Sequence, residues 1–257
     1  MQDYKDDPEN PENIIWLGRR TAYLGKFRNA IAIFTKGIEK FPDDPRMYRH
    51  RGHRFITLRR YGLAIDDYLK AAELIAGKED EIEEDGVPNV SGTPISTLHS
   101  NVWYHLGLAH YLKGDYQKAL TAYKICSEIS DNNDKIVSTT YWKYMTLRLL
   151  GKNKAAEKLL EKITKDMDVI ENQQYFECLL MFKGEITAEK LLEKARAQGA
   201  FGISTIGYGI ANWYYFNDEK DKSKALLEEI VSLDFWASFG YIAAEADLHR
   251  LSQEKVK

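Results

Sequence analysis

Apolar residues recur in the first part of the chain at spacings of three and four, the period of a helix that buries one face. Two such stripes follow one another: Ile14, Leu17 and Gly18, then Phe27, Ala30, Ile31 and Phe34. Gly25 lies between them, and glycine accepts the positive φ angle that a tight turn needs. The pattern predicts two helices joined by a short turn, with an apolar face that a neighbouring helix pair must cover.

The same pattern returns after 34 residues. The equivalent positions of this second copy are Gly52, Tyr61, Ala64, Tyr68 and Ala71. A third copy follows 55 residues later, because the stretch 79–99 interrupts the period. A fixed period of this length predicts stacked helical hairpins. Small side chains are expected where helices cross closely, at Gly18, Ala30, Ala64, Gly107 and Ala119.

The repeated residues resemble the tetratricopeptide repeat family. Its pattern reads here as Ile14-x2-Leu17-Gly18, Ala30-x3-Phe34, Gly37 and Pro42, and in the third copy as Trp103-x2-Leu106-Gly107, Gly114-Asp115-Tyr116, Ala119 and Tyr123. The sequence departs from the pattern at Arg51, Arg59 and Asp131. The resemblance implies an all-α fold, a right-handed α-solenoid of about six hairpins plus a C-terminal capping helix. It also implies a protein–protein interaction scaffold rather than an enzyme.

The repeat sets the expected boundaries. A flexible segment is expected at 1–10, a single superhelical domain at 11–251, and a tail at 252–257. The predicted repeats cover 11–44, 45–78 and 100–133, then in degenerate form 134–166, 167–199 and 200–233, with a capping helix at 235–251.

Composition excludes several classes of protein. The chain is 44% hydrophobic and 29% charged, as in ordinary soluble folded proteins, and no apolar run approaches the roughly 18 residues that would span a bilayer. A net charge of -3 gives no general attraction to nucleic acid. Cys126 and Cys178 cannot form a disulfide framework, and Cys126 is expected to be a buried thiol at a small-residue position. Compartment stays open: cytoplasmic, or periplasmic or secreted if a leader has been removed. Oligomeric state stays open too.

The resemblance implies that the first helix of each repeat lines a concave groove. The residues expected to contact a peptide or partner protein there are Arg19, Arg46, Arg49, His50, His53, Tyr104, His105, Leu108, Tyr111 and Trp142. Between residues 46 and 60 the chain has six Arg and two His without one acid. Two interpretations are open: arginines paired with acids elsewhere in the chain, or a site for an acidic partner.

No nucleophile or phosphate-loop motif is present, so no catalytic residue, metal or cofactor is expected. An alternative function is a ligand- or metal-binding accessory of an enzyme, using the Arg/His cluster, with His50, His53 and His105 as candidate ligands. The stretch 79–99 begins with an acidic block. Because it follows the basic repeat directly, we expect it to fold back onto that repeat and compete with acidic partners.

Overall fold

The computed structural model describes residue 7 and residues 9–84 and 89–254. Most of the segment 1–10, part of the acidic stretch and half of the tail 252–257 therefore lie outside the described residues. The helices are α2 (Pro11–Tyr23), α3 (Phe27–Lys40), α4 (Pro45–Thr57), α5 (Tyr61–Ile75), α6 (Leu98–Lys113), α7 (Tyr116–Glu128), α8 (Asn133–Leu149), α9 (Asn153–Leu160), α10 (Gln173–Phe182), α11 (Ala188–Ala197), α12 (Gly199–Phe216), α13 (Lys220–Val231) and α14 (Phe239–Glu254). To within two residues each predicted repeat range holds two of these helices, with α6, α8 and α12 beginning before the ranges 100–133, 134–166 and 200–233, and the fold is all-α.

The first two hairpins begin in the same way. Asn10 accepts a hydrogen bond from the Glu12 amide, and Asp44 accepts one from the Arg46 amide. A proline follows each cap at the first helical position, where its missing N–H costs nothing. Sequence alone therefore fixes where α2 and α4 start.

The turns within the hairpins share one backbone feature, a residue with positive φ. Gly25, Gly151 and Gly184 supply it with φ of 73°, 68° and 81°. In the second hairpin Arg59 takes the turn position with φ 58°, and in the sixth Asp218 takes it with φ 64°. The left-handed conformation is costly for a side chain that carries Cβ, so packing of the hairpins holds these two residues in place.

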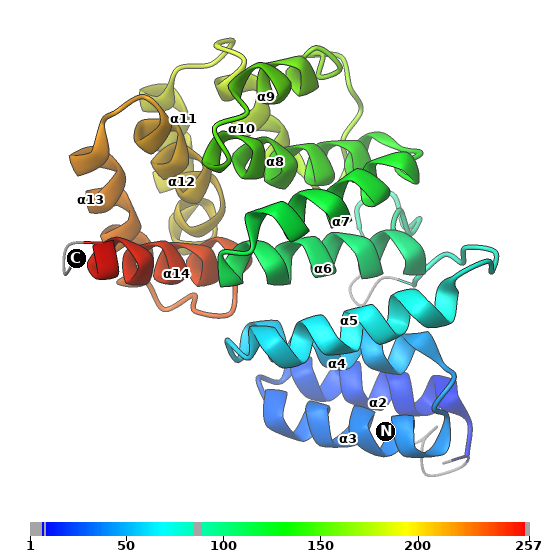
Figure 1. Cartoon of the computed structure of the whole chain (residues 1–257). Coiled ribbons are helices and arrows are strands. Elements are labelled where there is room, and N and C mark those ends of the chain that lie inside the picture. The colour runs from blue at the N-terminus through cyan, green and yellow to red at the C-terminus, as the bar shows by residue number, and fades with distance from the viewer. Residues whose placement is uncertain (1–6, 8, 85–88, 255–257) are drawn as a thin grey trace. The chain divides into compact units, whose positions relative to one another are not determined.

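The described chain forms two compact units, which divide within α7. The first comprises residues up to Lys113 together with 121–129. Here α2, α3, α4, α5 and α6 pack in order, and the first helices of successive hairpins, α2 with α4 and α4 with α6, also touch (Figure 1). Contact between every second helix is what stacked hairpins require. A single domain over 11–251 stays a prediction.

Small residues let the paired helices of this unit approach. Gly18, Gly52 and Gly107 each face an aromatic ring of the following helix, and those rings belong to Phe34, Tyr68 and Tyr123. Ala30 and Ala64 have no exposed surface, as expected for a close crossing. The repeated sequence pattern therefore marks one recurring contact, in which an aromatic ring of the second helix packs on a glycine of the first helix (a ring-on-glycine contact).

The second unit comprises 114–120 and residues from 130 onward. In it α8 packs on α9 and α10, α10 on α11 and α12, and α12 on α13 and α14. The glycines of α12 serve this packing, because a Cβ on Gly209 would lie 2.6 Å from the Cys178 Sγ. The unit therefore continues the hairpin architecture where the sequence repeat has decayed.

The stretch that interrupts the repeat connects α5 to α6 within the first unit. Two short antiparallel segments form its base: the Leu98 amide donates to the Glu81 carbonyl at 2.9 Å, and the Glu83 amide donates to the Ser96 carbonyl at 3.0 Å. An isolated bridge joins Ile82 and Thr97. This pairing fixes the direction in which the Glu83 side chain leaves the backbone.

Candidate functional site: the basic helix α4 and its acids

Acids from other elements neutralise most of the arginines of α4. Arg46 contacts the Asp44 carboxylate at 2.7 Å and the Glu12 carboxylate at 2.8 Å, and these acids raise its pKa. Arg51 makes a two-pronged contact with Asp67, at 2.9 and 2.7 Å. For these two arginines the interpretation as intramolecular ion pairs is therefore correct.

The acidic stretch also reaches α4, as expected. Arg49 Nη2 lies 2.8 Å from Glu83 Oε1, and Arg49 is only 7% exposed. Nearby, Arg19 Nη2 donates to the Glu84 carbonyl at 2.7 Å, while the Arg19 guanidinium stacks on Trp16, 4.3 Å from the ring centroid. An extended segment of chain thus places a carboxylate and a carbonyl on two of the arginines predicted to bind a partner.

The histidines of the cluster are neutral; His50 and His105 are buried, and His53 is partly buried. Arg49 Nη1 lies 3.0 Å from His50 Nδ1, and since a guanidinium only donates, that nitrogen accepts. His105 Nδ1 lies 2.7 Å from the Asn101 carbonyl and therefore donates. Burial, followed by the charge of Arg49, lowers the pKa of His105 to about 3. Burial and Arg49 likewise hold the pKa of His50 well below its ordinary value, and burial and Arg54 do so for His53.

The three rings pack among aromatic neighbours. His50 stacks on Phe34 with centroids 5.5 Å apart, and His105 lies 5.0 Å from His53 and 5.8 Å from Tyr68. In the part of the chain that the structure describes, no three His, Cys, Asp or Glu side chains converge as metal ligands do. The surrounding arginines would also repel a cation.

Three of the predicted groove residues, Leu108, Tyr111 and Trp142, have no exposed area, so the expectation that their side chains lie open to a partner is wrong. The same expectation fails for His50 and His105, which are 4% and 5% exposed. Trp142 packs between Tyr175 and Tyr208 inside the second unit, with centroids 6.3 and 5.7 Å away. Leu108 and Tyr111 lie on α6, which has buried residues around its whole circumference. Tyr104 is partly buried against His105 and Tyr123.

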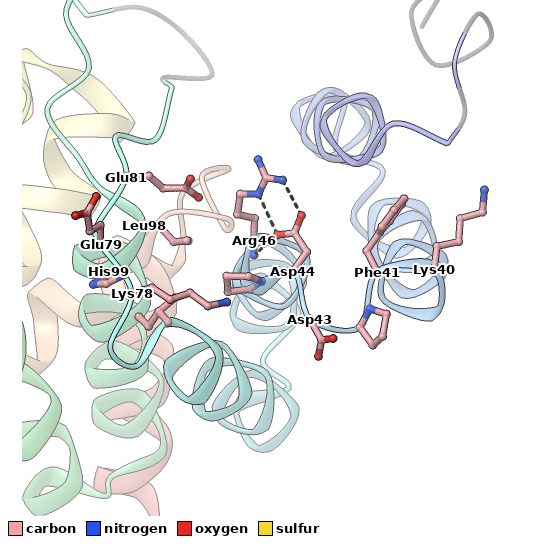
Figure 2. Close-up of a pocket in the computed structure, with 13 residues that line it drawn as sticks. Lys40, Phe41, Asp43, Asp44, Arg46, Lys78, Glu79, Glu81, Leu98 and His99 are labelled. Atoms are coloured by element: carbon pink, nitrogen blue, oxygen red, sulfur yellow. Dashed lines mark hydrogen bonds and ion pairs between the residues drawn. The ribbon is translucent and has the colours of Figure 1, made fainter.

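The structure brings five of the other predicted residues together around three hollows of the first unit: Arg19, Arg46, Arg49, His50 and His53. Tyr104 and His105 are not among the residues that line these three hollows. The largest, about 610 Å³, lies between the start of α4 and the base of the acidic stretch. Figure 2 shows Arg46 on one side of it, joined to Asp44, with Glu79 and Glu81 across from them. A second hollow of about 180 Å³ holds Arg19, Arg46 and His50 with Glu81 and Glu83. A third, of about 120 Å³, lies where Arg19, Arg49 and Arg54 meet.

A comparison of the sequence with models of protein families agrees with the stacked hairpins of the structure. Two models of the tetratricopeptide repeat match the chain, at residues 17–80 and 100–133. Within these two ranges the chain consists of tetratricopeptide repeats. The matched residues cover the first, second and third hairpins, in which the ring-on-glycine contacts recur.

Solved structures of tetratricopeptide repeat proteins are similar in fold. One from Parabacteroides merdae is 15% identical, covers 95% of this chain and 88% of its own, and has a TM-score of 0.52. YrrB, described as a TPR protein with an unusual peptide-binding site, is 14% identical, covers 96% of both chains and has a TM-score of 0.49. The repeats of a putative kinesin light chain of Podospora anserina are 13% identical, cover 88% and 95%, and have a TM-score of 0.49. No curated protein matches the chain.

The tetratricopeptide repeat fold is in general that of a protein–protein interaction scaffold, and proteins of this kind are generally not enzymes. It suggests a protein or peptide as the partner. None of the described helices is long and apolar enough to cross a membrane. The site residues that the sequence analysis missed are Glu12, Asp44 and Asp67 as partners of arginine, and Arg54 as a residue that lines the third hollow.

Proposed function

We propose that the protein is an interaction scaffold whose first unit binds an acidic, extended segment of a partner protein along α2 and α4. The observation that carries the proposal is the contact between Glu83 and the buried Arg49, together with the contact from Arg19 to the backbone of Glu84. An extended acidic segment is already accommodated there in cis. A partner segment would offer the same two groups, a carboxylate to Arg49 and a carbonyl to Arg19.

Chemistry favours this class of ligand over others. A guanidinium recognises a carboxylate through directed, charge-assisted hydrogen bonds, and such bonds are stronger at a buried position such as that of Arg49. Arg46 contributes less, since Asp44 and Glu12 already neutralise it. The buried His50 and His105 hold the arginine side of the groove in position rather than contact the partner. The proposed contact residues are thus Arg19 and Arg49, with His53 and Tyr104 at their border.

The test is a titration of the full chain with a fluorescent Glu-rich peptide and with its Gln-substituted counterpart. Binding of the acidic peptide alone is expected, and Arg49→Glu should abolish it. Because Arg49 is buried, the neutral Arg49→Gln variant is measured beside it, with circular dichroism as the check on folding. Arg28→Glu, at an exposed site on α3, is the control and should bind as the unaltered protein does. Equal binding by folded Arg49 variants would refute the proposal.

A further inference from the structure

Arg54 differs from Arg46, Arg49 and Arg51, the other arginines of α4. Among the described residues its guanidinium has no acid and no hydrogen-bond acceptor, and its neighbour is the Phe27 ring, 6.0 Å from the centroid. The side chain is partly buried. Burial and the nearby charge of Arg49 lower its pKa to about 10, so it is still a cation at neutral pH. A charge that is even partly buried and lacks a partner is destabilising, and proteins keep one chiefly where something else supplies the counter-charge.

The hollow beside Arg54 has room for that counter-charge. Its volume of about 120 Å³ corresponds to roughly four water molecules. Arg19, Arg49 and Arg54 line it, and Glu83 is the acid among its lining residues, so three positive charges minus one negative charge leave a formal charge of +2. His50 and His53 add neutral ring nitrogens.

Two buried polar atoms at this place lack a hydrogen bond. Arg49 Nε has no acceptor, and Arg49 is only 7% exposed, so water does not readily replace one. Glu83 Oε2 has no donor. Buried polar atoms are almost always satisfied in folded proteins, so such a pair points to a missing group. An oxyanion that also carries a hydroxyl would satisfy both, by accepting from the guanidinium and donating to the carboxylate.

We propose that the hollow bounded by Arg19, Arg49 and Arg54 binds one oxyanion of the phosphate class, either free or carried by a partner segment. The charge of +2 matches a dianion, and the fork of guanidinium donors matches the oxygens of phosphate. Glu83, by its second oxygen, favours the hydroxyl of hydrogen phosphate over sulfate. The site shares Arg19 and Arg49 with the proposed scaffold function and adds Arg54, so the two proposals rest on one groove but are tested with different ligands.

Inorganic phosphate is the probe. Calorimetric and thermal titrations of the full chain, at constant ionic strength in an amine buffer, should show one phosphate per chain and a rise in Tm that chloride does not produce. Arg54→Gln should weaken phosphate at least tenfold without lowering the Tm of the free protein, because it removes an uncompensated charge. Arg60→Gln, at an exposed position just beyond α4, should bind phosphate as the unaltered protein does. Arg54→Lys, which keeps the charge, should lose the guanidinium fork and bind more weakly.

A serine-containing acidic peptide and its phosphoserine form, measured in the same buffer, separate the outcomes. If the phosphopeptide binds more tightly and free phosphate competes with it, the phosphoryl group belongs to a partner; if the two peptides bind alike while free phosphate still binds, the anion is a free one. Both results uphold the site. Phosphate that affects the protein no more than chloride does, or unchanged phosphate binding by Arg54→Gln, would overturn it. Peptide binding without phosphate binding would overturn this inference alone, and phosphate binding without peptide binding would overturn the scaffold proposal alone.

Discussion

Gly18, Gly52 and Gly107 lie where an aromatic ring of the next helix meets the backbone of the first helix in each hairpin. The rings are fully buried or nearly so, and close packing on every side leaves them no space to move. One added carbon at such a glycine therefore acts on the crossing of two helices. The sequence period identifies these positions because glycine and aromatic residues recur together.

Gly107→Ala should destabilise the protein. A Cβ at residue 107 would lie 2.5 Å from the Tyr123 ring, which has no exposed surface, so the helices must separate at a cost of about 1–3 kcal/mol. Gly62→Ala on α5 is the control, since a Cβ there meets nothing within 4 Å and alanine favours a helix by about 0.5–1 kcal/mol over glycine. Thermal unfolding measures both changes. A Tm for Gly107→Ala equal to that of the unaltered protein would mean that the crossing is looser than the structure describes.

The buried histidines should make stability depend on pH. His105 takes up a proton near pH 6.5 when unfolded but only near pH 3 when folded, so the stability present above pH 6.5 is lost as pH falls toward 3. Each such histidine lowers the free energy of unfolding by about 1.4 kcal/mol per pH unit within that window. His105→Gln should therefore reduce the slope of urea-unfolding free energy between pH 6 and pH 4 by about one proton. His249→Gln, at an exposed position, is the matched control. An unaltered slope in His105→Gln would show that His105 is protonated in the folded state.

Turn residues mark a limit of sequence reasoning at this scale. A glycine between two predicted helices indicates a turn with a positive φ angle, as at Gly25 and Gly151. Arg59 adopts the same conformation without any local signal, and Asp218 does so with only the weak signal that an aspartate gives, because the packing of the helices on either side imposes it. The second hairpin could still be predicted from its period, whereas the sixth had no period to supply the missing turn.

At the scale of elements, the positions of the helices could be predicted from the sequence, but the ion pairs and the burial of the predicted groove residues could not. Caps, prolines and the 34-residue period are local features, so α2, α4 and their partners could be predicted. Which acid meets which arginine depends on tertiary contacts, such as that of Arg51 with Asp67 on the following helix. The positional rule for groove residues also assumes an open first helix, and it fails on α6. The signal was available there: between Val102 and Leu112 the sequence has no continuous polar face.

Glu83→Gln should separate the structural and competitive roles of the acidic stretch. The change leaves Arg49 buried without a charged partner, which costs about 3–5 kcal/mol of stability when a buried pair is broken. The vacated arginine should then bind an acidic peptide severalfold more tightly, and the peptide should restore part of the lost stability. Unfolding curves with and without peptide measure both effects.

Glu84→Gln is the control for that experiment. Its side chain is exposed, and Arg19 contacts its backbone carbonyl, which the substitution keeps. It should alter neither stability nor peptide binding. Tighter binding by Glu84→Gln as well would indicate a general loss of negative charge, and unchanged binding by Glu83→Gln would make the stretch a fixed wall of the groove.

At the scale of the whole molecule, net charge and local charge have opposite signs. The chain carries 36 basic and 39 acidic side chains, so its long-range field is weakly negative and does not attract an acidic partner. Attraction begins only within about a Debye length of the arginines, roughly 10 Å at 0.1 M salt. Specificity for an acidic segment would therefore arise after encounter, in the groove of the first unit.

Salt should consequently weaken binding of the acidic peptide through the dissociation rate more than the association rate. Contacts across α2 and α4 are short-range and partly buried, so raising salt from about 0.05 to 0.5 M should cost severalfold in affinity, well short of the loss for a strongly steered complex. Stopped-flow measurement of both rates tests this. Arg28→Glu, at an exposed position on the outer helix α3, is the control and should alter neither rate. A salt effect confined to the association rate would place the attraction in the field of the whole molecule, and would remove the reason for assigning it to Arg49 and Arg19.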